Sequence, residues 1–233
     1  MKADNGGLSL KQWCAVLGPV LLYLLLGLGL RTLLLWVGLD EVSARTVSAC
    51  SFPIPAAIWY YCKEANGPRA WAAACPRMAV EIIAVTLCLA LTAAWASRWT
   101  AVLASPGSAL TVLGFGVAGP VTEEILYRGI VLRRCDTYFG TGWAVFLSTV
   151  LFGFAHQPAA NVCVSLAAGL AFCLLCVRWR TLLAPIVVHV GVNLLSFVQL
   201  EQHLPEGVLL FGMLALVTFL VRMALACFRD KKN

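Results

Sequence analysis

Long apolar segments, separated by short polar ones, run through nearly the whole chain. Because a helix needs about 20 apolar residues to cross the hydrocarbon core of a bilayer, each of these segments predicts one membrane span when the chain is divided at its charged residues, prolines and glycines. Eight spans result, and the fifth and sixth are the shortest. They cover residues 13–38, 43–62, 78–97, 108–132, 141–157, 161–178, 182–200 and 207–228.

The composition agrees with a chain that lies mainly in lipid. Of 233 residues, 61% are hydrophobic and only 12% are charged, a charged share about half that of an ordinary soluble domain. Such a composition excludes collagen-like, disordered and disulfide-framework proteins. The sequence therefore predicts an all-α fold: a polytopic membrane helix bundle of about eight transmembrane helices, with residues 1–233 forming a single transmembrane domain.

The basic residues predict the orientation of this bundle. The formal net charge is +6, and an even number of spans places both ends of the chain on one side. Only Arg45 and Arg98 fall on the opposite side, so the positive-inside rule predicts cytoplasmic termini and no nucleic-acid partner. The basic residues on the predicted cytoplasmic side are Lys2, Lys11, Lys63, Arg69, Arg77, Arg133, Arg134, Arg178, Arg180, Arg229, Lys231 and Lys232.

Several charged residues lie inside predicted spans, where an isolated ion costs at least about 2.5–3.5 kcal/mol. Glu81 follows Arg77 by four residues, which predicts a local ion pair. Arg222 can extend its side chain to the cytoplasmic surface. Arg31, in the first span, has no partner that the sequence identifies.

The fourth span carries a cluster of charges in the segment GPVTEEILYRGI. Glu124 and Arg128 are one helical turn apart and face together, whereas Glu123 points about 100° away. This spacing predicts a structural role for Glu124 and an available carboxylate at Glu123. Upstream, Gly119 and Pro120 predict a break or kink whose free backbone groups must be buried in protein or line a wet cavity, so that water can reach Glu123.

Two of the three histidines lie in predicted spans and have polar or aromatic neighbours at helical spacing. Phe152 precedes His156 by one turn, and Asn193 follows His189 by one turn, so each pair shares a helix face. A single membrane histidine or asparagine most often makes an interhelical hydrogen bond, but here several such groups occur together. The third histidine, His203, is expected at the surface.

Two histidines and two glutamates could in principle supply zinc ligands. The chain has no HExxH motif, however, and neither membrane histidine is four residues from another histidine or from a cysteine. We therefore predict neither a metal nor another cofactor.

Three motifs, EExxxR at residues 123–128, FxxxH at residues 152–156 and HxxxN at residues 189–193, occur on the fourth, fifth and seventh predicted spans. Together they resemble the motifs of the CPBP family, the CAAX-protease and bacteriocin-processing intramembrane proteases. All three match without substitution, and the eight-span layout fits the CAAX-processing branch. The resemblance covers a catalytic core at about residues 108–200.

The resemblance implies an intramembrane endopeptidase of glutamic type. Glu123, helped by His156, would hold and deprotonate a water molecule that attacks the substrate carbonyl. His189 and Asn193 would donate hydrogen bonds to the tetrahedral oxyanion. The same residues can also be drawn around a metal ion, so the chemistry is compatible with either scheme.

Four further residues would support this site. Glu124 and Arg128 would fix the helix and the electric field around the base, and Arg128 would be near enough to contact the substrate. Tyr127, one turn from Glu123, would orient it, and the ring of Phe152 would form a wall. The implied partners are the lipid bilayer and a membrane-embedded or lipidated peptide substrate, and the expected location is the bacterial plasma membrane, as a multi-pass integral protein.

Depth along the predicted spans gives a further expectation. Counted from the predicted cytoplasmic ends at about 1.5 Å per residue, Glu123 lies roughly 15 Å deep and His189 roughly 10 Å deep, which predicts a cavity that opens to the cytoplasm. His156 falls deeper, at roughly 22 Å. The boundary or tilt of the fifth span must differ from this simple count.

Two other functions fit parts of the pattern. A non-catalytic membrane binding or immunity protein could keep the same fold without turnover. A proton-coupled carrier would also have membrane acids, arginines and a Gly-Pro break, but no counterpart to Gly119-Pro120 occurs at a matching position in the other half.

Overall fold

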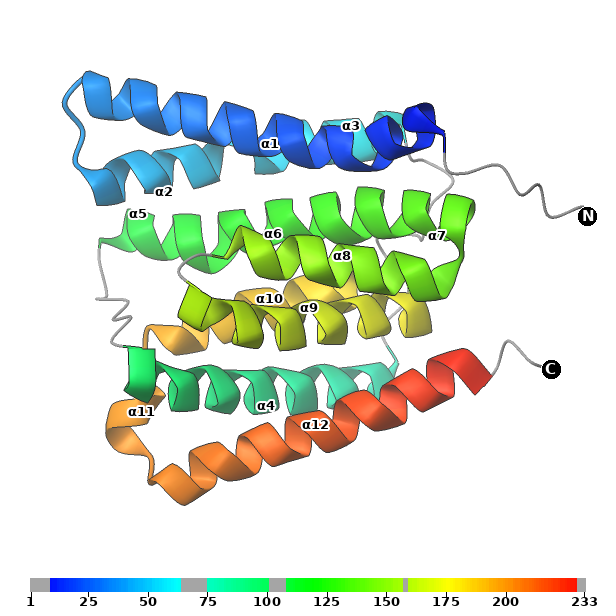
Figure 1. Ribbon diagram of the computed structural model, residues 1–233. Helices are drawn as coiled ribbons and strands as arrows, with labels where there is room; N and C mark the ends of the chain where they lie inside the picture. Colours follow the sequence, from blue (N-terminus) through cyan, green and yellow to red (C-terminus); the bar gives the residue numbers. More distant parts are fainter. Residues whose placement is uncertain (1–8, 64–74, 101–107, 157–158, 230–233) are drawn as a thin grey trace, which may run out of the picture.

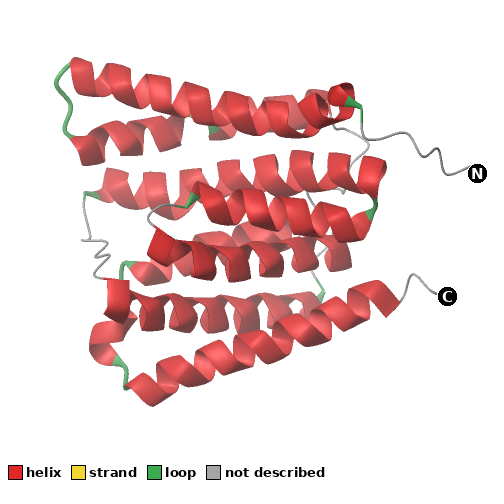
Figure 2. Ribbon diagram, viewed as in Figure 1, coloured by secondary structure: helices red, strands yellow, loops and turns green. Residues whose placement is uncertain are grey.

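The computed structural model describes residues 9–63, 75–100, 108–156 and 159–229. All regular elements in this part of the chain are helices (Figure 2). Within these ranges, five helical segments are long and apolar enough to cross a membrane, which confirms the prediction of a polytopic helical membrane protein. These segments are Leu10–Trp36, Pro76–Arg98, Ala109–Phe139, Val162–Trp179 and Glu206–Cys227.

The other predicted spans are shorter than expected. Helices α8 (Thr141–Ala155) and α10 (Leu183–Ser196) are apolar but have only 15 and 14 residues. The second predicted span is divided into α2 (Glu41–Ser51) and α3 (Pro53–Lys63). The division falls at Pro53, where the missing N–H and the ring of proline stop a helix from continuing.

The helices lie side by side, and successive passes run in opposite directions (Figure 1). Helix α1 (Leu10–Trp36) begins at the end of the bundle where α12 (Glu206–Arg229) finishes, as an even number of passes requires. The remaining long helices are α4 (Pro76–Thr100) and α9 (Ala159–Trp179), and the four-residue α11 (Leu200–His203) precedes α12.

A continuous helix from Ala109 to Phe139 passes through the centre of the bundle and carries the EExxxR motif. The sequence predicted a break or kink at Gly119-Pro120, but the helix continues through this point. Instead, α6 (Gly119–Glu124) lies between two wider π-helical segments, η1 (Val112–Ala118) and η2 (Ile125–Leu132). The short α5 (Ala109–Thr111) and α7 (Arg133–Phe139) complete its two ends. π-Helical turns inside α-helices occur frequently at functional sites.

Small residues allow close packing around this helix. A Cβ atom at Gly114 would lie 3.2 Å from the backbone oxygen of Thr46 in α2, and one at Gly116 would lie 2.8 Å from a side-chain carbon of Leu194 in α10. The helices therefore approach closely at these glycines, and in lipid such packing replaces the missing hydrophobic driving force.

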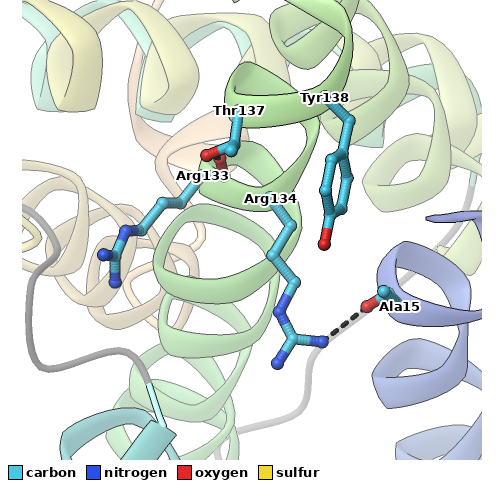
Figure 3. Close-up of a pocket in the computed structure, with 5 residues that line it drawn as sticks. All are labelled: Ala15, Arg133, Arg134, Thr137 and Tyr138. Atoms are coloured by element: carbon cyan, nitrogen blue, oxygen red, sulfur yellow. Dashed lines mark hydrogen bonds between the residues drawn. The ribbon is translucent and has the colours of Figure 1, made fainter.

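Long-range polar contacts tie the helices at the end where α1 begins. Arg178 makes a two-fold hydrogen bond with Glu81 at 2.9 and 3.0 Å, and the indole of Trp179 donates to the same carboxylate at 2.9 Å. The predicted partner, Arg77, is 3.6 Å from Glu81 and is a secondary contact. At the same end, Arg134 reaches from α7 to the backbone oxygen of Ala15 in α1, 2.5 Å away (Figure 3).

Replacing Gly212 in α12 tests the packing of α12 against α4. A Cβ atom there would overlap the Cβ of Leu91, so Gly212→Ala should lower the stability by about 1–3 kcal/mol through overpacking. Gly207→Ala, in the same helix but with nothing within 4 Å of the added Cβ, is the matched control and should leave the stability unchanged or slightly higher. Thermal unfolding in detergent micelles measures both. Equal midpoints for the two variants would contradict this packing.

Candidate active site

The buried ion pair of Glu124 and Arg128 lies at the centre of the site. Both side chains are completely buried, and Nη1 of Arg128 donates to Oε1 of Glu124 at 2.9 Å, as the spacing of four residues predicts. Nη2 of Arg128 donates to the backbone oxygen of Gly169 in α9 at 3.0 Å. The guanidinium lies 4.4 Å from the ring centre of Phe152 and 5.1 Å from that of Phe172.

This enclosure defines what Arg128 can do. A buried charge requires a partner, and the carboxylate, the carbonyl and two aromatic faces supply partners for the guanidinium. Nε of Arg128 and Oε2 of Glu124 are buried without a hydrogen-bond partner among the described residues. Arg128 does not line the cavity that contains Glu123. The suggestion that it also contacts substrate therefore disagrees with its burial, and its contacts are those of a residue that holds Glu124 in place.

His189 connects the ion pair to the cavity. Its Nδ1 atom lies 2.9 Å from Oε1 of Glu124. Since the ionised carboxylate can only accept, Nδ1 carries the proton and donates it. The imidazole is stacked on Phe172, with 4.8 Å between the ring centres, and meets Phe152 edge-on at 5.6 Å. These contacts fix the ring so that Nε2 points away from the ion pair.

Glu123 lies on the neighbouring face of the helix and is 22% exposed. Its Oε2 atom is 3.6 Å from Nε2 of His156 and 3.9 Å from Nε2 of His189. The two histidines come from different helices and present the same ring nitrogen to one carboxylate oxygen. The structure thus brings Glu123, His156 and His189 together around a common point.

His156 owes its position to the end of α8. The helix stops at Ala155, and His156 adopts a non-helical backbone conformation as its C-cap residue. Nδ1 of His156 is 2.8 Å from the backbone oxygen of Phe152, which can only accept, so Nδ1 is the protonated nitrogen. In the neutral ring, Nε2 is then a hydrogen-bond acceptor directed toward Glu123.

Asn193 contacts the central helix through a carbonyl group that Pro120 leaves free. The N–H of Gly119 bonds to the oxygen of Gly114, five residues back. In the same register the oxygen of Phe115 would accept from residue 120, but proline has no N–H. Nδ2 of Asn193 donates to this oxygen at 2.9 Å. One amide N–H of Asn193 is therefore occupied, and the second is available.

The four candidate residues Glu123, His156, His189 and Asn193 line one cavity of about 550 Å³. Its other walls come from α1, α2 with its C-cap residue Phe52, the central helix and the last residue of α8: Tyr23, Leu24, Gly27, Leu28, Arg31, Arg45, Ser48, Ala49, Phe52, Phe115, Gly119, Pro120, Tyr127 and Ala155. The free backbone around Gly119-Pro120 thus borders this cavity, as the sequence predicted.

The cavity lies in the other half of the bundle from the one we expected. Its walls extend to Arg31 and Arg45, near the turn between α1 and α2, and this turn is at the end opposite the start of α1 (Figure 1). With the predicted orientation, that end is the non-cytoplasmic one. The depth count gave the wrong half because it assumed straight spans that end at the charged residues, prolines and glycines. The greater depth counted for His156 already indicated this error.

Tyr127 does not orient Glu123 by a hydrogen bond. Its hydroxyl is buried and has no hydrogen-bond partner among the described residues, although Tyr127 lines the cavity. Its ring meets Phe152 edge-on at 5.4 Å, and its backbone oxygen accepts from Ser148 at 2.9 Å. The contacts of Tyr127 join the central helix to α8.

Sequence reasoning missed three residues of this site. Phe172 supports both His189 and Arg128, Phe115 supplies the carbonyl for Asn193, and Gly169 lets Arg128 approach the backbone of α9. A Cβ at Gly169 would lie 3.1 Å from the ring of Phe152. The small-residue segment AAGLAF in the sixth predicted span was the signal that could have found Gly169 and Phe172.

Within the described residues, no group of three or more histidine, cysteine, aspartate or glutamate side chains is arranged to hold a metal ion. Oε1 of Glu124 is engaged by Arg128 and His189.

Glu124→Gln should destabilise the protein far more than Glu123→Gln. The amide removes the charge that compensates the completely buried Arg128, and breaking a buried pair in this way costs about 3–5 kcal/mol. Glu123 is partly exposed in the cavity, so its neutral variant should unfold within a few degrees of the wild type. Thermal unfolding of the two variants measures the difference, and similar losses for both would show that Glu124 is not the structural member of the pair.

Comparison with known proteins finds matches for the part of the chain that contains this site. Residues 104–195, less than half of the chain, match the family model "Type II CAAX prenyl endopeptidase Rce1-like". A relative from Bacillus subtilis (strain 168), named "Putative membrane peptidase YdiL", is 28% identical over 96 residues, which are 41% of this chain and 38% of the relative. No solved structure matches. The matched segment contains the three motifs, and both matches support the resemblance of this segment to the CPBP family.

Proposed function

We propose that this protein is an intramembrane endopeptidase of glutamic type, which hydrolyses a peptide bond of a membrane-associated substrate. The family match supports a CAAX-type protease. The observation that carries the mechanism is the convergence of two Nε2 atoms, from His156 and His189, on one oxygen of Glu123 within a cavity.

The attacking water would bind between Glu123 and His156. Both groups facing it are acceptors, because Nδ1 of His156 already donates to Phe152. A water molecule that donates one hydrogen to the carboxylate and one to Nε2 presents a lone pair to the substrate. As its oxygen bonds to the carbonyl carbon, Glu123 takes up the proton as a general base.

The oxyanion that forms would receive hydrogen bonds from Asn193 and His189. Asn193 has one amide N–H left after its bond to Phe115. His189 donates through Nε2, which requires the doubly protonated ring because Nδ1 is held by Glu124. Donors already fixed in this way stabilise the transition state without reorganisation. Glu123 then gives its proton to the leaving amine as the C–N bond breaks, and the carboxylate is regenerated.

A second, apolar cavity supports a lipidated or apolar substrate. It has a volume of about 100 Å³ and adjoins the catalytic cavity, since Tyr23 and Phe52 line both. Its other walls are Pro19, Leu22, Leu26, Pro55, Ala56, Trp59, Thr122, Leu126 and Ile130. Such a lining suits an apolar side chain, or the first carbons of a lipid chain, next to the scissile bond.

The proposed function predicts that Glu123→Gln and His156→Ala lose cleavage. Purified protein in liposomes would be incubated with a library of membrane-anchored peptides, and products would be identified by mass spectrometry. Removal of the general base or of its partner should lower kcat/KM by about 100-fold or more, while thermal unfolding stays close to that of the wild type. His203→Ala, an exposed histidine outside the cavity, is the matched control and should cleave normally.

Several results would overturn parts of this proposal. Cleavage that survives Glu123→Gln would reject Glu123 as the base. Loss of cleavage with a chelator, restored by zinc, would replace the glutamic scheme with a metal-dependent one. A protein that binds peptides without forming products would be a non-catalytic member of the family, and solute flux in liposomes without product peptides would indicate a carrier.

A further inference from the structure

The cavity that contains Glu123 has a positively charged end. Arg31 of α1 and Arg45 of α2 both line it, with side chains 34% and 54% exposed. Among the described lining residues, these two are the only arginines or lysines, and Glu123 is the only carboxylate. Arg31 is the residue for which the sequence offered no partner.

Glu41, the first residue of α2, holds both arginines. Arg31 donates to it through Nη2 and, at 3.3 Å, through Nε, and Arg45 donates through Nε at 2.5 Å. Burial raises the pKa of Glu41, but the hydrogen bonds from Arg31 and Arg45 outweigh this effect, so that its pKa lies below the ordinary value. Glu41 therefore stays ionised and offsets only one of the two positive charges.

The neighbouring acid does not remove the remaining charge from the cavity. Asp40 caps the N-terminus of α2, where its carboxylate accepts from the backbone N–H groups of Val42 and Ser43 at 3.0 Å, and it does not line the cavity. Each guanidinium has five N–H donors. The contacts with Glu41 use two of them in Arg31 and one in Arg45, so further donors can face the cavity.

We propose that Arg31 and Arg45 bind a carboxylate of the substrate peptide while Glu123 acts on the scissile bond. This inference rests on the proposed protease function. An anion that reaches both arginines would receive charge-assisted hydrogen bonds, which are the strong ones, in a cavity partly screened from water. A peptide carboxylate is favoured over a lipid headgroup because the same cavity also contains Glu123 and its two histidines.

The geometry also gives the distance from the carboxylate to the cleaved bond. Tyr23, which lines the cavity together with Glu123, precedes Arg31 by eight residues on α1. At about 1.5 Å per residue the two positions are about 12 Å apart along the helix. An extended peptide covers about 3.3 Å per residue, so the carboxylate would follow the scissile bond by three or four residues.

The test compares matched peptides that differ only in their carboxylates. The starting peptide is one that the wild type cleaves and the Glu123→Gln variant does not. It would be prepared in three forms. The first has a free C-terminal carboxylate, the second has a C-terminal amide and no acidic residue, and the third has a C-terminal amide and one aspartate three or four residues after the cleaved bond. KM and kcat would be measured for the wild type, Arg31→Gln and Arg45→Gln in phosphatidylcholine liposomes. Arg98→Gln is the control, because Arg98 binds backbone oxygens of Glu201 and Leu204 outside the cavity.

For the carboxylate peptide we expect each arginine variant to raise KM about tenfold or more, since hydrogen bonds to charged groups are worth the most, with little change in kcat. For the fully amidated peptide, the wild type should already have the high KM, and the variants should add nothing. Activity of the aspartate peptide would identify a side-chain carboxylate as the ligand, and its failure would identify the C-terminal one. An equal loss with acid and amide peptides, or no loss, would overturn the proposal.

Binding separates this proposal from the protease function. Fluorescent acid and amide peptides of the same sequences would be titrated into the Glu123→Gln protein, which binds without turnover. Tighter binding of the acid, abolished by Arg45→Gln, would support the carboxylate site even if no peptide is cleaved. Arg45 is the more exposed arginine and makes a single bond to Glu41, so this variant should fold even if Arg31→Gln does not. Equal affinity for the acid and amide peptides would refute the carboxylate site. Displacement of the fluorescent peptide by phosphatidylglycerol vesicles, but not by unlabelled acid peptide, would refute it as well.

Discussion

The buried ion pair of Glu124 and Arg128 is the constraint on which the rest of the site depends. Two charges removed from both water and lipid headgroups must satisfy one another and find further partners. They do so by engaging Gly169 of α9, His189 of α10 and the rings of Phe152 and Phe172. One interaction therefore joins four helices in a fixed arrangement.

This arrangement leaves the adjacent carboxylate unconstrained. Glu123 follows the backbone of the same helix but faces the cavity, where His156 and His189 present Nε2 atoms to it. Two neighbouring acids thus have different environments, one enclosed by donors and the other next to open space. In the proposed mechanism Glu124 fixes the positions of the surrounding side chains, and Glu123 transfers the proton. This division follows from the positions of the two residues on the helix.

Local backbone geometry provides the other half of the site. Proline at position 120 removes an N–H in a helix that is already widened on both sides, and the free oxygen of Phe115 binds Asn193. At this depth a free carbonyl is tolerated only next to protein donors or water. The same proline that disturbs the helix therefore positions a polar side chain beside the cavity.

Much of this could be predicted from local spacing, and the remainder depends on contacts between distant segments. The apolar segments predicted the passes, and the four-residue spacing predicted that Glu124 faces Arg128. The partner of Arg31 depends on how α1 turns into α2, and the pairing of Glu81 with Arg178 joins residues 97 positions apart. The spacing of apolar residues does not mark the widened turns. The half of the bundle that holds the cavity depends on where α8 ends, which the apolar pattern does not mark either.

The most direct test of the central claim is a single turnover in water labelled with oxygen-18, followed by mass spectrometry of both the product and the protein. If Glu123 activates a water molecule, the label enters the new C-terminal carboxylate of the product and Glu123 remains unlabelled. If oxygen-18 appears in the side chain of Glu123, the carboxylate has attacked the substrate directly, and Glu123 is a nucleophile and not the general base of the proposed mechanism.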